Sequence, residues 1–253
     1  MANMENCKIE QENGLCTLIF SRPDSLNALS SNLLKEVKEF LKERAHQEDL
    51  KILIITGEGD KSFAAGADIA EMFKLKPGKA EEYFALGQEV ADLLETAPYI
   101  TIAAVNGYAL GGGLEMALGC DYIYAAERAK LGLPEVGLGL IPGFGGVTRL
   151  IEAIGMRKAK ELIFSGSYLN ADQAMDYGLV NRVFSNETLI EETKKRAETL
   201  LENDMYAVIQ AKRAANYRLK EGRSQALANE ASFCAECLSK DSAQQRIERF
   251  LEK

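Results

Sequence analysis

The chain has 253 residues, of which 47% are apolar and 27% charged, and its formal net charge at pH 7 is −8. A chain of this length and composition can bury a sizeable core without disulfide bonds or metal ions. The negative charge argues against binding to a nucleic-acid backbone, and no run of about eighteen apolar residues predicts a membrane span. Five cysteines and the absence of a signal-peptide pattern favour a reducing, cytoplasmic compartment.

The first half of the chain predicts alternating strands and helices. Continuous apolar runs are typical of strands covered on both faces, and apolar residues at helical spacing indicate amphipathic helices. On these patterns we expect strands at 15–23, 51–59 and 99–113, and helices at 30–50, from within 61–73, and from 74–84 to about Glu95. This order implies βαβ units with right-handed crossovers.

The second half of the chain becomes progressively helical. Residues 120–126 predict a further strand, and residues 129–146 predict a long loop interrupted by glycines. The pattern beyond that loop is largely helical, and the tail over 203–253 predicts two or three more helices. We therefore expect an α/β fold with a core over residues 1–190 and an α-helical C-terminal region over residues 191–253.

Several common catalytic and binding motifs do not occur in the sequence. There is no GxxxxGK[ST] phosphate loop, and residues 137–143 (GLGLIPG) do not join a strand tightly to a helix as a dinucleotide fingerprint does. There is no GxSxG motif, and the only histidine, His46, is expected on the polar end of a surface helix. The single CxxC pair, Cys234 and Cys237, falls in a helical pattern, so we expect no metal site there. Acid–base chemistry must then fall to carboxylates, lysine, tyrosine or cysteine.

Two glutamates have unusually apolar surroundings. Glu115 lies in GGGLEMALG, and Glu135 lies in LGLPEVGLG. A pair of glutamates in a cleft of low dielectric could act as base and acid, because desolvation raises the pKa of each carboxyl group toward the working pH. Each residue also has a purely structural interpretation, in which Glu115 pairs with Arg149 and Glu135 caps a loop. The residues themselves leave both interpretations open.

Two segments of very small residues precede predicted helices. They are AAGAD at 64–68 and GGG at 111–113, and each follows a predicted strand. Backbone N–H groups of such segments are not shielded by side chains, and two of them facing one point would form an oxyanion hole. The alternative is close packing between strand and helix, which also requires small residues.

Four motifs in chain order resemble the enoyl-CoA hydratase/isomerase (crotonase) superfamily. They are SRPDSLNALS (21–30), FAAGADIAEM (63–72), AAVNGYALGGGLEMALGCDYIYA (103–125) and GLPEVGLGLIPGFGGVTRL (132–150). The likeness extends from near residue 15 into the C-terminal region and is strongest to short-chain enoyl-CoA hydratases of the bacterial crotonase type.

The resemblance implies a fold and an activity. The implied fold is a spiral of ββα turns, rather than a doubly wound sheet, in which residues 191–253 form a trimerisation or lid region and trimers pair into hexamers. The implied activity is reversible syn addition of water to trans-2-enoyl-CoA, giving 3-hydroxyacyl-CoA, in fatty-acid β-oxidation or a related acyl-CoA pathway. Coenzyme A is then part of the substrate, and we expect no separate cofactor.

The resemblance also assigns roles to residues of this chain. Glu115 and Glu135 match the two hydratase glutamates, and Ala67 and Gly112 match the residues whose amides form the oxyanion hole. The matching acyl-CoA contacts, expected largely through backbone groups, are Ser25, Leu26, Ala28, Ala65, Asp68, Ile69, Gly111, Pro134 and Gly143.

Some positions depart from the family pattern. Leu133 stands where hydratases often carry glutamine, Leu114 stands where they often carry cysteine, and GGVTRL replaces the commoner GGTQRL. These changes make the expected pocket wall more apolar or alter its shape. An enoyl-CoA isomerase, which commonly keeps only the glutamate at position 135, is one alternative activity. A non-catalytic acyl-CoA-binding or RNA-associated member of the superfamily is another, and the net charge and both glutamates argue against it.

Overall fold

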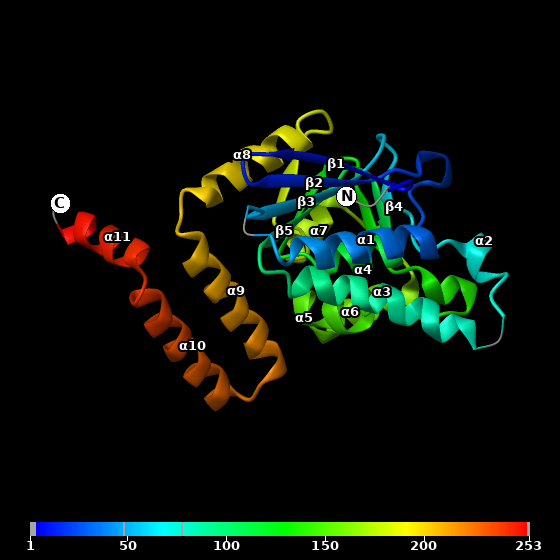
Figure 1. The fold of residues 1–253 in the computed structure, drawn as a ribbon. Coiled ribbons are helices and arrows are strands. Elements are labelled where there is room, and N and C mark those ends of the chain that lie inside the picture. The colour runs from blue at the N-terminus through cyan, green and yellow to red at the C-terminus, as the bar shows by residue number, and fades with distance from the viewer. Residues whose placement is uncertain (1–3, 48, 77, 252–253) are drawn as a thin grey trace. The chain divides into compact units, whose positions relative to one another are not determined.

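The computed structural model describes residues 4–47, 49–76 and 78–251. The chain divides into two compact units, Met1–Lys194 and Lys195–Lys253 (Figure 1). Within the described residues, no helix is both long enough and apolar enough to cross a membrane. The same residues contain no group of three or more His, Cys, Asp or Glu side chains placed to hold a metal ion.

The described residues of the first unit form two β-sheets. The larger sheet has six strands in the order β1-β2-β3-β5-β7-β10, and all neighbours are parallel except β1 and β2. Their bounds are β1 Cys7–Glu12, β2 Leu15–Phe20, β3 Ile52–Gly57, β5 Ile100–Val105, β7 Tyr122–Ala126 and β10 Arg182–Phe184. Every residue of β3 and of β5 is buried, as expected for strands covered on both faces.

In the smaller sheet, too, neighbouring strands follow one another in the order of the chain. Its strands are β4 Ser62–Ala64, β6 Tyr108–Leu110, β8 Lys130–Gly132 and β9 Tyr168–Asn170, and only β8 and β9 pair antiparallel. The chain therefore passes from β3 to β4, from β5 to β6 and from β7 to β8, placing one strand in each sheet at every turn. This is the expected ββα spiral, and parallel pairing within each sheet agrees with the predicted βαβ units.

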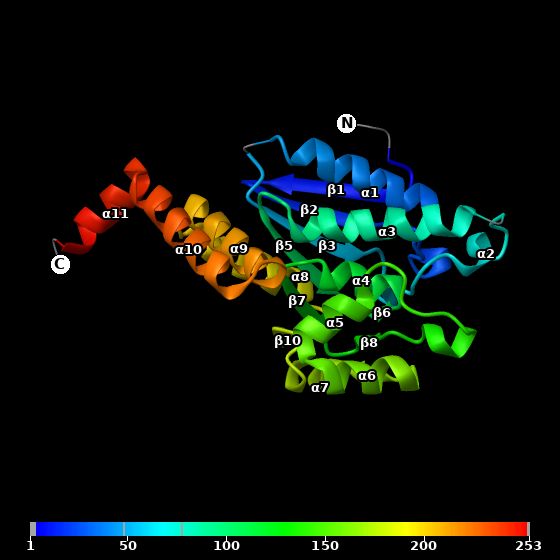
Figure 2. The ribbon, with the colours of Figure 1, turned by 90° about the horizontal axis from the view of Figure 1, so that it is seen from below.

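Helices cover the sheets of the first unit. They are α1 Ser31–Arg44, α2 Ile69–Met72, α3 Lys79–Glu95, α4 Gly112–Leu118, α5 Gly146–Ile154, α6 Met156–Ser165 and α7 Ala171–Asp176, with short 3₁₀ turns η1 Pro23–Ser25 and η2 Glu135–Leu138. Helices α1 and α3 lie side by side along the larger sheet (Figure 2). Helix α1 begins after Ser30, whose side chain accepts a hydrogen bond from the Leu33 amide and so caps the helix.

Helix α8, Leu189–Leu201, is followed by three helices of the second unit, α9 Met205–Lys220, α10 Arg223–Leu238 and α11 Asp241–Leu251. Helices α9 and α10 pack against each other through the rings of Tyr217 and Phe233, whose centroids are 5.8 Å apart. Cys234 and Cys237 lie inside α10, as the helical pattern predicts.

Three predicted boundaries are wrong. The strand predicted over 99–113 ends at Val105, and β6 and the start of α4 follow it within that range. The helix predicted over 30–50 ends at Arg44, so His46 lies in the following turn instead of on the helix. The loop predicted over 129–146 contains β8 and the turn η2. A three-residue strand is too short to produce a readable hydrophobic period, and its pairing with β6 and β9 comes from residues distant in sequence.

Candidate active site

The spiral brings Ala67 and Gly112 together. Strands β4 and β6 are parallel neighbours, and Ala64 of β4 is paired with Ala109 of β6. Ala67 and Gly112 each lie three residues beyond these partners, at equivalent points of two successive turns. A Cβ atom added to Gly112 would be 3.3 Å from the Ala67 nitrogen. The two amides therefore lie close in space although 45 residues separate them in sequence.

The backbone around Ala67 directs its amide away from the neighbouring chain segment. Ala67 forms a parallel β-bridge with Leu29. The Leu29 amide donates to the Gly66 carbonyl at 2.8 Å, and the Asp68 amide donates to the Leu29 carbonyl at 3.2 Å. In a parallel pairing, the residue between these two bonds points its own N–H group to the opposite side. The Ala67 N–H is thus turned away from Leu29.

The Gly112 amide lies at the first position of α4, where an N–H group has no acceptor inside the helix. The preceding residue, Gly111, has φ +50° and ψ −125°, a combination that favours glycine. Its own amide donates to the Gly132 carbonyl at 2.9 Å, which joins the end of β6 to the end of β8. The glycine motif therefore fixes the start of α4 while leaving the Gly112 amide available to a ligand.

Glu115 is a buried carboxylate with defined partners. Its exposed fraction is 2%, and its Oε1 atom accepts hydrogen bonds from the amides of Phe144 and Gly146, both at 2.7 Å. The pKa of Glu115 is raised to about 7, because burial and the nearby Glu135 carboxyl raise it by more than the Gly146 and Phe144 amides lower it. At neutral pH this group can therefore either hold or release a proton.

The structure does not contain the ion pair between Glu115 and Arg149 that one interpretation of the sequence expects. The Arg149 guanidinium instead donates to Glu95 at 3.0 Å and to the Phe144 carbonyl at 3.1 Å, and it also pairs with Asp92. Arg149 thus holds the loop whose amides bind Glu115 and acts on the carboxylate only from a distance, lowering its pKa.

Glu135 begins the turn η2, directly after Pro134. Its Oε2 atom is buried and has no hydrogen-bond partner among the described residues. A buried, unpaired carboxyl oxygen is costly, and burial raises the pKa of Glu135 accordingly. A Cβ atom added to Gly111 would be 2.9 Å from the other oxygen, Oε1, so this glycine makes room for the carboxyl group.

One cavity of about 110 Å³ contains most of the predicted site. Its predicted lining residues are Ala65, Ala67, Ile69, Gly111, Gly112, Glu115, Pro134, Glu135 and Gly143. It is also lined by Gly66, Met72, Phe84, Leu138, Leu140, Ile141 and Phe144, none of which the sequence predicted as site residues. Two carboxyl groups and two backbone amides therefore meet in a pocket whose other walls are mostly apolar.

Four predicted contacts, Ser25, Leu26, Ala28 and Asp68, do not line this cavity. They lie beside it, where the Leu26 carbonyl accepts from the Ala65 amide at 3.0 Å. Arg22 fastens the segment, because its guanidinium donates to the Ala28 carbonyl at 2.5 Å and pairs with Asp68 at 3.0 Å. The segment 25–28 is thus held against residues 65–68, and its role in binding the rest of a CoA thioester stays a prediction.

Two aromatic rings form part of the apolar wall that the sequence did not predict. Phe84 comes from α3 and Phe144 from the loop before α5, and their ring centroids are 6.1 Å apart. A Cβ atom on Gly143 would overlap the Phe84 ring at 2.4 Å, and one on Gly87 would overlap the Phe144 ring at 2.1 Å. Gly87 and Gly143 are consistent with close packing at these two points, but the sequence does not identify the ring that each glycine contacts.

The buried Glu115 carboxyl group makes stability depend on pH. Its pKa in the folded chain is about 7, against an ordinary value of 4.5, so the unfolded chain loses this proton more easily than the folded one. The stabilisation from the protonated group is complete below pH 4.5 and is lost as pH rises through 7.

We expect the free energy of unfolding of Glu115→Gln to increase relative to that of the wild type between pH 5 and 8, by on the order of 3 kcal/mol. Urea unfolding across this range measures the gain, with the exposed Glu161→Gln as control, and a difference independent of pH contradicts the prediction.

Comparison with known proteins agrees with the fold and the motifs. The chain matches the enoyl-CoA hydratase/isomerase family over residues 10–253. It is 43% identical over 249 residues to a crotonyl-CoA hydratase of Syntrophomonas wolfei, covering 98% of this chain and 96% of that protein. It is 39% identical over 250 residues to a short-chain-enoyl-CoA hydratase of Clostridium acetobutylicum, covering 99% and 96%.

Solved structures give the same result. The crystal structure of an enoyl-CoA hydratase from Bacillus anthracis superposes with a TM-score of 0.95 at 32% identity, covering 98% of this chain and 96% of that one. An enoyl-CoA hydratase structure from Geobacillus kaustophilus superposes with a TM-score of 0.92 at 36% identity, covering 98% and 95%. With its ββα spiral and these full-length matches, the chain belongs to the enoyl-CoA hydratase/isomerase family.

Proposed function

We propose that this protein is an enoyl-CoA hydratase that adds water reversibly, with syn geometry, to short trans-2-enoyl-CoA thioesters to give 3-hydroxyacyl-CoA. The observation that carries the proposal is the meeting of the buried Glu115 and the partly buried Glu135 with the Ala67 and Gly112 amides around one cavity. Relatives named crotonyl-CoA hydratase and short-chain-enoyl-CoA hydratase support the choice of reaction.

The amides bind the thioester carbonyl in this proposal. The carbonyl oxygen accepts hydrogen bonds from Ala67 and Gly112, and negative charge builds up on it as an enolate forms. Each well-placed donor stabilises such a transition state by about 3–4 kcal/mol. Because both donors are backbone groups fixed by strand pairing and by the start of α4, they need little reorganisation during the reaction.

The two glutamates carry out the proton transfers to and from the substrate and the water. Glu115 accepts a proton from water as the water oxygen forms its bond to C3, and the electron pair of the C2–C3 double bond moves toward the thioester carbonyl. Glu135 donates a proton to C2, so that one hydroxyl group and one hydrogen are added in total. The raised pKa values suit both roles, because they bring each carboxyl group closer to neutral pH. Dehydration reverses the steps.

A substrate panel tests the proposal against the isomerase alternative. Purified protein is expected to remove the ultraviolet absorbance of the conjugated thioester in crotonyl-CoA, and mass spectrometry of the product is expected to show the gain of one water. Activity on 3-enoyl-CoA with none on any 2-enoyl-CoA would select an isomerase. Binding of acyl-CoA without turnover of either class would select a non-catalytic member.

The size of the cavity favours short acyl chains, and Phe84 is the aromatic wall that α3 contributes. We expect Phe84→Ala to raise kcat/KM for 2-octenoyl-CoA relative to crotonyl-CoA by about tenfold, since a few methylene groups gain apolar contact in the enlarged pocket. Phe73→Ala is the matched control, because that ring is 91% exposed and does not line the cavity. An unchanged ratio of the two kcat/KM values would show that Phe84 does not limit chain length.

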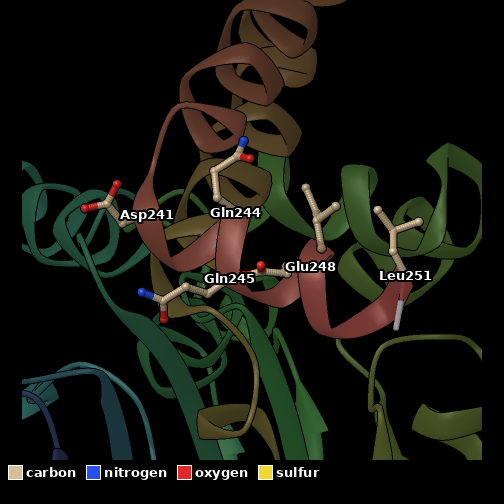
Figure 3. A pocket seen from close by; sticks show the side chains of 6 residues that line it. Asp241, Gln244, Gln245, Glu248 and Leu251 are labelled. Carbon is tan, nitrogen blue, oxygen red and sulfur yellow. The ribbon is translucent and has the colours of Figure 1, made fainter. Parts of the chain in front are cut away.

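We also propose that residues 191–253 contribute to trimer assembly or cover the substrate, with two trimers forming a hexamer. Large apolar side chains on α10 and α11 are exposed in the single chain, including Leu238 at 54% and Phe250 at 77%. Leu251 and four polar residues of α11 are drawn in Figure 3, where they line a surface pocket of that helix. Light scattering is expected to give the mass of three or six chains.

The protein's place in the cell is a separate part of the proposal. We propose a cytoplasmic enzyme of fatty-acid β-oxidation or a related acyl-CoA pathway, with an acyl-CoA as substrate and no additional cofactor. Cys7 and Cys16, the two most deeply buried cysteines, are thiols rather than half of a disulfide, which suits a reducing compartment.

A further inference from the structure

We propose that the hydroxyl group of Tyr83 positions the Ala67 amide for the thioester oxygen, an inference that rests on the proposed function. Tyr83 lies on α3 and was not among the predicted site residues. It does not line the cavity, so it acts through the backbone rather than on the substrate.

The Tyr83 hydroxyl contacts two backbone groups next to the bridge between Leu29 and Ala67. It donates a hydrogen bond to the Leu29 carbonyl at 2.5 Å and accepts one from the Asp68 amide at 3.2 Å. The same Asp68 amide also donates to the Leu29 carbonyl at 3.2 Å. One hydroxyl, one carbonyl and one amide thus form a closed set of three hydrogen bonds.

This set of bonds controls the direction of the Ala67 N–H group. Leu29 is the bridge partner of Ala67, and Asp68 is the next residue along the chain. Tyr83 therefore fixes the separation of the two segments at the point where the Ala67 peptide is oriented. The Asp68 carboxylate also pairs with Arg22 at 3.0 Å, which holds the same segment in place.

The ring of Tyr83 is itself held in place. Its side chain is buried, and its ring lies 5.6 Å from that of Phe144 and 5.7 Å from that of Phe84, centroid to centroid. Burial raises the pKa of the Tyr83 hydroxyl, so it stays protonated and remains a donor across the working pH range. Tyr83→Phe removes the two hydrogen bonds while preserving the ring and its packing.

The expected kinetic effect follows from the precision that an oxyanion donor requires. A small displacement of a donor weakens its bond to the developing oxyanion more than its contact with the ground-state carbonyl. We expect Tyr83→Phe to lower kcat for crotonyl-CoA hydration by about tenfold with KM nearly unchanged. Thr56→Val is the matched control, because it also removes a buried hydroxyl that donates to a backbone carbonyl, that of Ala104 at 2.8 Å, outside the site.

A spectroscopic measurement separates positioning from a general loss of stability. The infrared band of the carbonyl in ¹³C-labelled butyryl-CoA, a saturated thioester that cannot be hydrated, reports how strongly the amides polarise the carbonyl. We expect the band to move to lower wavenumber on binding to the wild type and to Thr56→Val, and to move less on binding to Tyr83→Phe.

An equal shift in Tyr83→Phe and the wild type would overturn the inference, whatever the rates. So would an equal fall in kcat in the Tyr83 and Thr56 variants. The butyryl-CoA measurement does not depend on turnover. A wild-type protein that shifts the carbonyl band but does not hydrate crotonyl-CoA would therefore refute the proposed function. The comparison with Tyr83→Phe would still test the positioning role of Tyr83.

Discussion

Replacing either Glu115 or Glu135 by glutamine is expected to lower kcat for crotonyl-CoA hydration by at least about a hundredfold, the scale of general acid–base catalysis. Glutamine has nearly the same shape but cannot exchange a proton at neutral pH. In Glu115→Gln the amide oxygen can still accept from the Phe144 and Gly146 amides, so the loop stays in place. The loss then comes from proton transfer alone.

The two glutamates are expected to act as a unit on one water. The double variant Glu115→Gln/Glu135→Gln should therefore be only slightly slower than the slower single variant, since each single change already disables the step. Stopped-flow and steady-state rates measure this, with the exposed Glu161→Gln retaining wild-type activity. Near-wild-type turnover in either single variant would contradict the paired mechanism.

A methyl group at Gly112 is expected to lower kcat/KM for crotonyl-CoA by about a hundredfold to a thousandfold, the cost of losing one oxyanion donor. The added Cβ in Gly112→Ala would lie 3.3 Å from the Ala67 nitrogen and 2.8 Å from the Phe144 ring. It would thus occupy the space beside both amides and displace a ring that lines the cavity.

The control for this change is Gly222→Ala, where an added Cβ has nothing within 4 Å and φ is negative. We expect that variant to keep wild-type kcat/KM. Circular dichroism and thermal unfolding of Gly112→Ala show whether the fold survives. Full activity of a folded Gly112→Ala protein would mean that the Gly112 amide does not contact the thioester oxygen.

The sequence predicts those parts of the fold that leave a local pattern of apolar and polar residues. The continuous apolar run of β3 and the helical spacing of α1 and α3 are visible in the sequence, because burial on one or both faces dictates residue type. The spiral itself was not visible in these patterns. It depends on pairings such as Ala64 with Ala109, and only the family resemblance implied it.

The candidate site likewise contains residues that the sequence predicted and residues that it did not. Glu115 and Glu135 stood out because a charged residue inside an apolar segment is costly and so calls for an explanation. Phe84 and Tyr83 did not stand out, because an aromatic residue on an amphipathic helix is ordinary. Their importance comes from contacts with Gly143 and Leu29, which are 59 and 54 residues away in the sequence.

The most direct test of the paired-glutamate hydratase is the reaction of crotonyl-CoA with the wild-type protein in D₂O, followed by NMR of the product. The proposed mechanism predicts 3-hydroxybutyryl-CoA with a single deuterium at C2, on the same face as the new hydroxyl group at C3. Deuterium distributed over both faces of C2, or no hydroxylated product, would contradict it.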